Sequence, residues 1–162
     1  MTEAGARTPS RTRTTALLKA GAVVVVVLVL DQLTKAWVRS DIDIHETHKF
    51  LPGVNLVHVR NSGVAFGFFA GGGVIVLVFT FVALAVLLGY FLLRPDRPLL
   101  WLPTGMLIGG AIGNLIDRVA HGAVTDFIKL PFWPAFNLAD MSITFGVLAL
   151  LYVLEGPKPD AE

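Results

Sequence analysis

Residues 125–140, TDFIKLPFWPAFNLAD, join two long apolar segments of the chain. This connection is short and aromatic, it is broken by two prolines, and it carries Asp126 near its start and Asp140 at its end. An ionised carboxylate at the centre of a bilayer costs a few kcal/mol or more, so two acids beside apolar segments need an explanation. Either each Asp caps a helix at the water interface, or the two form a reactive pair. The stretch alone leaves both interpretations open.

The composition of the whole chain indicates an integral membrane protein. Of the 162 residues, 54% are hydrophobic and only 15% are charged, and the mean hydropathy is +0.70. Soluble domains contain about a quarter charged residues. The net charge is only +1, and we expect no nucleic-acid partner. The absence of Cys excludes disulfides, a thiolate nucleophile and cysteine-ligated zinc.

The apolar runs on either side of this connection predict a mainly α-helical fold with four transmembrane helices. We expect these helices at about 16–38, 72–93, 99–116 and 134–154. The last run has only 14 apolar residues, and about 20 are needed to cross a bilayer. We therefore expect the fourth helix to begin near Pro134, which places Asn137 and Asp140 on one face at membrane depth. Residues 1–15 and 155–162 are predicted to be tails, the first of them disordered, around a single membrane domain at 16–154.

Residues 39–70 differ in character from the predicted helices around them. They contain mixed charges followed by GVNLVHVR at 53–60, in which Val57 and Val59 alternate with His58 and Arg60. Such alternation is typical of a half-buried strand. We therefore predict a small extramembrane β-sheet in an insert at about 39–70, between the first and second helices.

The distribution of basic residues predicts the orientation of the chain in the membrane. Four spans place both termini on the same side, and four basic residues precede the first apolar run: Arg7, Arg11, Arg13 and Lys19. Positive charges are enriched on the cytoplasmic side of membrane proteins. Both termini are therefore predicted to be cytoplasmic, and the 39–70 insert and the connection at 117–139 are predicted to lie together on the extracytoplasmic face.

This topology brings together two acids and several polar side chains. The expected set is Asp126, Asp140, Asn61, Asn114, Asn137 and Arg118. Two neighbouring carboxyl groups do not ionise together easily, so one keeps a proton while the other stays charged, as in aspartic proteases. An Asn side chain can donate and accept like a peptide unit, although each Asn could instead join two helices. Asp31 and Lys35 are four residues apart, so they can form an interfacial ion pair or help to shape the site.

Other chemistries fit the sequence less well. A serine nucleophile would be Ser62 or Ser142, but the chain has no GxSxG motif. The four His residues are scattered, without the spacing of a zinc site. The alternative from another class is a small proton-coupled membrane transporter, because intramembrane acids also relay protons. In this chain, however, the acids cluster at one end of the helices.

Five motifs, in order, resemble those of lipoprotein signal peptidase, also called signal peptidase II. They are DQLTK at 31–35, NSGVAFG at 61–67, GGAIGNLIDR at 109–118, VTDF at 124–127 and FNLAD at 136–140. The resemblance covers residues 30–145. It implies a multi-pass aspartic endopeptidase of the bacterial cytoplasmic (inner) membrane, with four helices and an extracytoplasmic β-cradle. Its substrate would be a diacylglyceryl-prolipoprotein, cut immediately before the lipidated cysteine, with the diacylglyceryl tails in membrane lipid.

The resemblance also implies roles for individual residues. Asp126 and Asp140 would be the catalytic pair, one activating a water and the other, protonated, polarising the scissile carbonyl. The residues that would line the substrate site are Asn61, Asn114, Arg118 and Asn137. Asp117 would support the fold or orient Arg118, and Asp31 and Lys35 match the first-helix motif. We expect no metal and no cofactor, and we expect the protein to act as a monomer.

Overall fold

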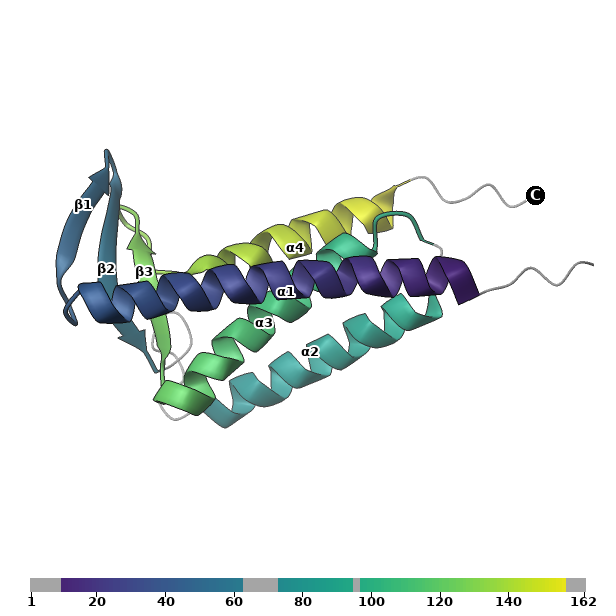
Figure 1. Cartoon of the computed structure of the whole chain (residues 1–162), viewed down its shortest axis with the longest axis horizontal. Coiled ribbons are helices and arrows are strands. Elements are labelled where there is room, and N and C mark those ends of the chain that lie inside the picture. The colour runs from purple at the N-terminus through teal and green to yellow at the C-terminus, as the bar shows by residue number, and fades with distance from the viewer. Residues whose placement is uncertain (1–9, 63–72, 95–96, 157–162) are drawn as a thin grey trace, which may run out of the picture.

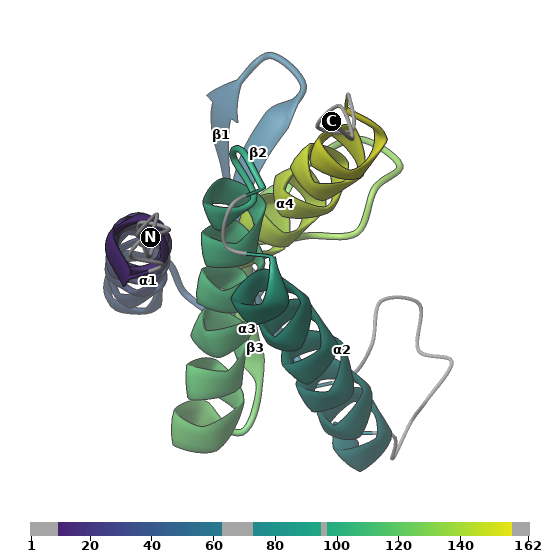
Figure 2. The same cartoon turned by 90° about the vertical axis from the view of Figure 1, so that its right-hand side faces the viewer.

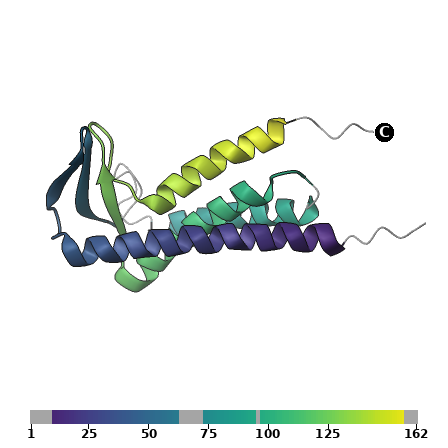
Figure 3. The same ribbon diagram turned by 45° about the horizontal axis from the view of Figure 1, so that its top comes forward.

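The computed structural model describes residues 10–62, 73–94 and 97–156, which form four helices and three strands (Figure 1). In chain order the elements are α1 (Ser10–Asp41), β1 (Thr47–Leu51), β2 (Val54–Asn61), α2 (Gly73–Leu93), α3 (Trp101–His121), β3 (Val124–Lys129) and α4 (Leu138–Glu155). The mainly helical fold with a small sheet agrees with the sequence prediction. The sheet lies at one end of the helices (Figures 1 and 3).

Helix α3 lies at the centre of the bundle, with the other three helices around it (Figure 2). Small residues on α3 let its neighbours approach closely. A Cβ atom added at Gly105 would lie 2.7 Å from the Ala20 carbonyl oxygen on α1, and one added at Gly110 would lie 2.6 Å from the Ala139 carbonyl oxygen on α4. Close approach at small residues is the usual way in which membrane helices associate.

The sheet is antiparallel in the order β1-β2-β3, so β2 is the central strand. Its third strand differs from the prediction, which placed the sheet within residues 39–70. Strand β3 comes from the connection between α3 and α4, and its register pairs Val59 with Asp126. This pairing carries Asp126 into the sheet. Residues 63–70 of the predicted insert lie outside the described residues.

Helices α1, α3 and α4 also differ from the prediction in where they begin or end. Helix α1 begins at Ser10, six residues before the predicted start at Ala16, because extending a nucleated helix by polar residues costs little. Helix α3 continues past the predicted end at Ile116 to His121, and Gly122 ends it with φ of 74°. Helix α4 begins at Leu138 and not near Pro134. Phe136 instead pairs with Ile128 of β3, and Asn137, which caps the helix, is extended.

Two helical segments in the described residues are long and apolar enough to cross a bilayer, Arg13–Asp41 and Leu138–Glu155. A shorter apolar segment, Phe81–Leu93, lies in α2. Large apolar side chains point outward along these helices, among them Val25 and Leu33 of α1 and Phe145 and Leu148 of α4. Exposed apolar surface of this extent is typical of a surface that contacts another apolar phase.

Candidate active site

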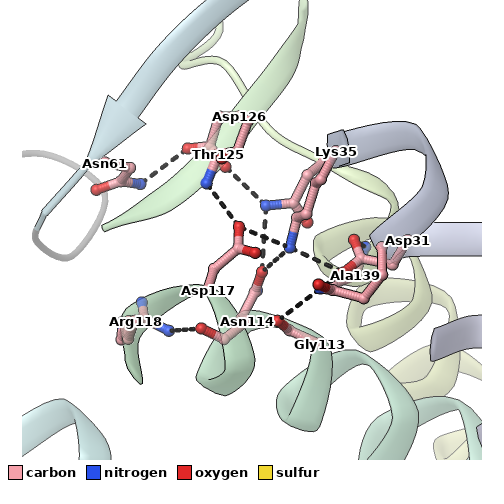
Figure 4. Close-up of polar contacts among 12 residues, drawn as sticks. Asp31, Lys35, Asn61, Gly113, Asn114, Asp117, Arg118, Thr125, Asp126 and Ala139 are labelled. Atoms are coloured by element: carbon pink, nitrogen blue, oxygen red, sulfur yellow. Dashed lines mark hydrogen bonds and ion pairs between the residues drawn. The ribbon is translucent and has the colours of Figure 1, made fainter. Parts of the chain in front are cut away.

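Asp126 lies on β3 and is almost completely buried, with 2% of its surface exposed. Both carboxylate oxygens accept hydrogen bonds from amides: Asn61 Nδ2 donates to Oδ2 at 2.9 Å and Asn137 Nδ2 to Oδ1 at 2.7 Å (Figure 4). Burial raises the pKa of Asp126 from 3.8 to about 6, and the nearby charge of Asp140 adds to the rise against the opposing effect of the two amides. Asp126 can therefore exchange a proton near neutral pH.

Asp140 lies in the first turn of α4 and is partly exposed. Its Oδ1 accepts a hydrogen bond from Asn114 Nδ2 at 2.8 Å, and its Oδ2 accepts one from the backbone N–H of Asn137 at 3.2 Å. In return, the backbone N–H of Asp140 donates to Asn137 Oδ1 at 2.9 Å, which completes a capping box. Asn137 thus contacts both carboxyl groups, and it is the link between them.

Asn114 of α3 is held in one orientation. Its Oδ1 accepts hydrogen bonds from Lys35 Nζ at 2.9 Å and from Asn137 Nδ2 at 3.2 Å. Because two donors fix the oxygen, the amide nitrogen of Asn114 faces Asp140. The same side chain therefore connects Asp140 to the buried cation of α1.

The predicted ion pair between Asp31 and Lys35 is present, with 2.8 Å between Asp31 Oδ2 and Lys35 Nζ. Both side chains are fully buried, and Lys35 Nζ also donates to Asn114 Oδ1, so the pair belongs to the polar network around the acids. Asp31 Oδ1 also accepts a hydrogen bond from the backbone N–H of Ala139 at 2.9 Å. The pair therefore anchors the start of α4, one residue before Asp140, to α1.

Asp117 supports the strand that carries Asp126. It is fully buried, and its Oδ2 accepts a hydrogen bond from the Thr125 backbone N–H at 2.8 Å. Lys35 Nζ lies 3.4 Å from Asp117 Oδ2, and Arg39 Nη1 lies 3.4 Å from Asp117 Oδ1. Arg39 Nη1 also donates to Thr125 Oγ1 at 3.2 Å. Asp117 thus orients Arg39 and Thr125, whereas Arg118 Nη1 donates to the Asn114 carbonyl oxygen at 3.3 Å.

Arg39 and Thr125 belong to this network but were not among the predicted site residues. A sequence signal for Arg39 existed, because Asp31, Lys35 and Arg39 follow one another at intervals of four residues and so share one face of α1. Thr125 directly precedes Asp126, but nothing in its type or spacing predicts its contact with Arg39.

The structure brings most of the predicted site residues into one hydrogen-bonded network. Its members are Asn61, Asn114, Asn137, Asp126 and Asp140, supported by Asp31, Lys35 and Asp117. Arg118 lies at the edge of this network, and the contact described for its side chain is with the backbone carbonyl of Asn114 (Figure 4). Across residues 10–62, 73–94 and 97–156, no group of three or more His, Cys, Asp or Glu side chains is arranged to hold a metal ion.

Comparison with known proteins finds relatives that match most of the chain. The chain is 45% identical over 130 residues to the lipoprotein signal peptidase of Moorella thermoacetica, an alignment that covers 79% of this chain and 87% of that one. It is 38% identical over 138 residues to the lipoprotein signal peptidase of Halothermothrix orenii, covering 84% and 95%. A bacterial membrane enzyme solved by the in meso method at 1.9 Å resolution superposes with a TM-score of 0.75 at 31% identity, covering 90% of this chain and 95% of the other.

The family model of signal peptidase (SPase) II matches residues 23–155, which include every residue of the network described above. The match begins within α1 and ends at the last residue of α4. The chain therefore belongs to the signal peptidase II family of membrane peptidases.

Proposed function

We propose that this protein removes the signal peptide from diacylglyceryl-modified prolipoproteins, with a water molecule activated between Asp126 and Asp140. The single observation that carries the proposal is the bridge formed by Asn137, which contacts both carboxyl groups. The two acids at opposite ends of one short connection are thereby held in one small polar site. The similar proteins are named lipoprotein signal peptidases, which favours this substrate class, and they give no support to the transporter alternative.

The chemistry follows from sharing one proton between two acids. One carboxylate removes a proton from water, which then attacks the scissile carbonyl, while the protonated carboxyl group polarises the carbonyl oxygen. Burial raises the pKa of Asp126 to about 6, so this carboxyl group can hold the shared proton near neutral pH. The intermediate collapses when the leaving amine receives a proton from the pair.

The surrounding amides suit an extended peptide. Asn61 Nδ2 and Asn114 Nδ2 each donate to one carboxylate, so both amides lie directly beside the acids, where the substrate backbone would pass. Arg118 is half-buried at the edge of the site, and its guanidinium keeps donors for a substrate carbonyl. Binding the substrate backbone in this way would hold its scissile bond beside the acids.

The proposed orientation places the sheet and both acids at the extracytoplasmic surface of the cytoplasmic membrane. All four helices would span the bilayer, with both termini in the cytoplasm. Asp126 lies on the sheet and Asp140 at the adjoining end of α4, so both are at one end of the bundle (Figures 1 and 3). The diacylglyceryl tails of the substrate would extend into lipid between the helices, and a single chain would contain the complete site.

The test uses purified protein in detergent with two forms of one prolipoprotein, with and without the diacylglyceryl group. We expect cleavage of the lipidated form only, with mass spectrometry locating the cut immediately before the modified cysteine. The variant Asp140→Asn, with folding confirmed by circular dichroism, is expected to release no product. Cleavage elsewhere, or equal cleavage of the unmodified form, would contradict the proposed substrate class.

A further inference from the structure

Four large apolar side chains gather at one end of the sheet, where they contact little of the protein. Phe50 and Leu51 end strand β1 and are 62% and 57% exposed, and Phe132 and Trp133, in the loop after β3, are 106% and 58% exposed. The two segments are neighbours, because a cavity of about 400 Å³ is lined by residues 49–53 on one side and by Pro131 on the other. We call these four residues the aromatic tip.

The backbone holds the aromatic tip in its outward position. Phe132 has φ of 60°, in the left-handed region that bulky residues rarely adopt. Two hydrogen bonds close the loop around it: Trp133 N donates to the Leu130 carbonyl oxygen at 3.3 Å, and Lys129 Nζ donates to the Trp133 carbonyl oxygen at 2.7 Å. The loop therefore turns Phe132 away from the protein, although burying this ring would be favourable in water.

The position and chemistry of the aromatic tip favour a lipid surface as its partner. Leu138, the first residue of α4, follows Phe132 by only six residues, and α4 is apolar enough to cross a bilayer. The sheet reaches out on the α4 side of the bundle, away from α1 (Figures 1 and 3). Aromatic rings are enriched at the level of lipid headgroups, and nearby lysines such as Lys49 and Lys129 are attracted to anionic lipids.

We propose that the aromatic tip inserts into the outer interface of the bilayer and fixes the sheet against the membrane. The inference rests on the proposed placement of the sheet at the extracytoplasmic surface, but not on the peptidase chemistry. Insertion at the tip would set the height of β3, and hence of Asp126, relative to the lipid. A substrate anchored in the same leaflet by its acyl chains would then meet the acids at a fixed depth.

The chain contains no Cys, so a single introduced Cys can carry a nitroxide spin label without further changes. The test position is Phe132→Cys, and the matched control is Thr47→Cys, an exposed position at the opposite end of β1. Both proteins are reconstituted in vesicles of phosphatidylethanolamine and phosphatidylglycerol. Power-saturation measurements then compare collisions with oxygen, which concentrates in lipid, and with a water-soluble nickel complex.

We expect the label at position 132 to favour oxygen over nickel, and the label at position 47 to show the reverse. Equal access of nickel to both labels would overturn the proposal. A label at 132 that is shielded from both reagents would also overturn it, because a protein surface, such as a second copy of the chain, would then cover the tip.

A second measurement guards against disturbance by the label. With Trp37→Phe and Trp101→Phe, Trp133 is the only Trp left, and we expect lipids brominated near the headgroup to quench its fluorescence. Strong quenching by aqueous acrylamide without quenching by these lipids would contradict insertion. Cleavage activity is assayed in the same vesicles, so that the two proposals can fail separately. A water-exposed tip in an active enzyme would contradict insertion of the tip but not the proposed function. An inserted tip in a protein without activity would contradict the proposed function but not the insertion.

Discussion

Asn137 performs two tasks with one side chain. Its Oδ1 caps α4 by accepting from the backbone N–H of Asp140, while its Nδ2 donates to Asp126. The residue is fully buried, so neither contact competes with water. Because the cap fixes the amide, the donor toward Asp126 is oriented before any substrate arrives. The arrangement couples the start of α4 to the protonation of Asp126.

The hydrogen bond from Asn61 lowers the pKa of Asp126 and so opposes the effect of burial. In Asn61→Leu we expect the ionisation of Asp126 in the pH profile of kcat/KM to move upward by about one to two pH units, since a hydrogen bond to a charged group contributes about 1.5–3 kcal/mol. Asn55→Leu, on the same strand but away from the acids, is the matched control. An unchanged or lowered ionisation in Asn61→Leu would contradict this assignment.

The raised pKa of Asp126 also predicts how stability depends on pH. The folded protein binds the proton more tightly than the unfolded chain, so the contribution of Asp126 to stability is retained below about pH 4 and lost as the pH rises to about 6. A rise from 3.8 to about 6 corresponds to about 3 kcal/mol. We expect the stability of the wild type relative to Asp126→Asn to fall by about this amount between pH 4 and pH 7.

Unfolding in detergent at a series of pH values measures this difference. Both proteins share every other titrating group, so the pH dependence of the groups that do not interact with Asp126 cancels. A stability difference that stays constant from pH 4 to pH 7 would show that Asp126 titrates alike in the folded and unfolded chains.

At the residue scale, the sequence predicted which residues belong to the site better than it predicted which of them contact one another. Asp31 and Lys35 were paired correctly, because a spacing of four residues brings side chains together on any helix. The contact of Arg39 with Thr125 joins residues 86 positions apart. Such a contact depends on how α1 packs beside β3, and no local pattern carries that information.

At the element scale, the glycines of α3 decide how closely the helices pack. Gly105→Ala would place a Cβ 2.7 Å from the Ala20 carbonyl oxygen and from Val23 Cβ, so α1 and α3 must move apart. We expect a loss of about 1–3 kcal/mol in stability from this overpacking. Gly89→Ala on α2 is the control, because a Cβ there meets no atom within 4 Å, and Ala is the better helix former by up to about 1 kcal/mol.

Thermal unfolding of the two variants in the same detergent compares them with the wild type. We expect a lower Tm for Gly105→Ala and an unchanged or higher Tm for Gly89→Ala. Equal Tm values for both variants would show that the close approach of α1 and α3 is not what holds the bundle together.

The elements differ in how well the sequence predicted them. The apolar segments correspond to helices because continuous hydrophobicity is a local signal. Strand β3 was missed because VTDFIK is short and has an acid at its centre, and its stability comes from pairing with β2, more than 60 residues away. Helix α4 begins later than predicted for a related reason, since Phe136 pairs with Ile128 and is therefore not helical.

At the scale of the whole molecule, the proposed orientation can be tested by introducing single Cys residues. Thr47 and Glu155 are both exposed and lie at opposite ends of the bundle. We expect a membrane-impermeant maleimide to label Thr47→Cys in cells with an intact cytoplasmic membrane, and to label Glu155→Cys only after that membrane is opened. Labelling of Glu155→Cys in intact cells would reverse the orientation and place the acids on the cytoplasmic face.

The central claim is that Asp126 and Asp140 act as one unit, and kcat/KM for lipidated prolipoprotein tests it most directly. The measurement compares the wild type with Asp126→Asn, Asp140→Asn and the double variant, each confirmed to be folded. Residues that act together in one step are not additive. We expect kcat/KM to fall at least about 10³-fold in each single variant, and to fall no further in the double variant. Near-normal cleavage by either single variant, or losses that multiply in the double variant, would contradict the shared mechanism.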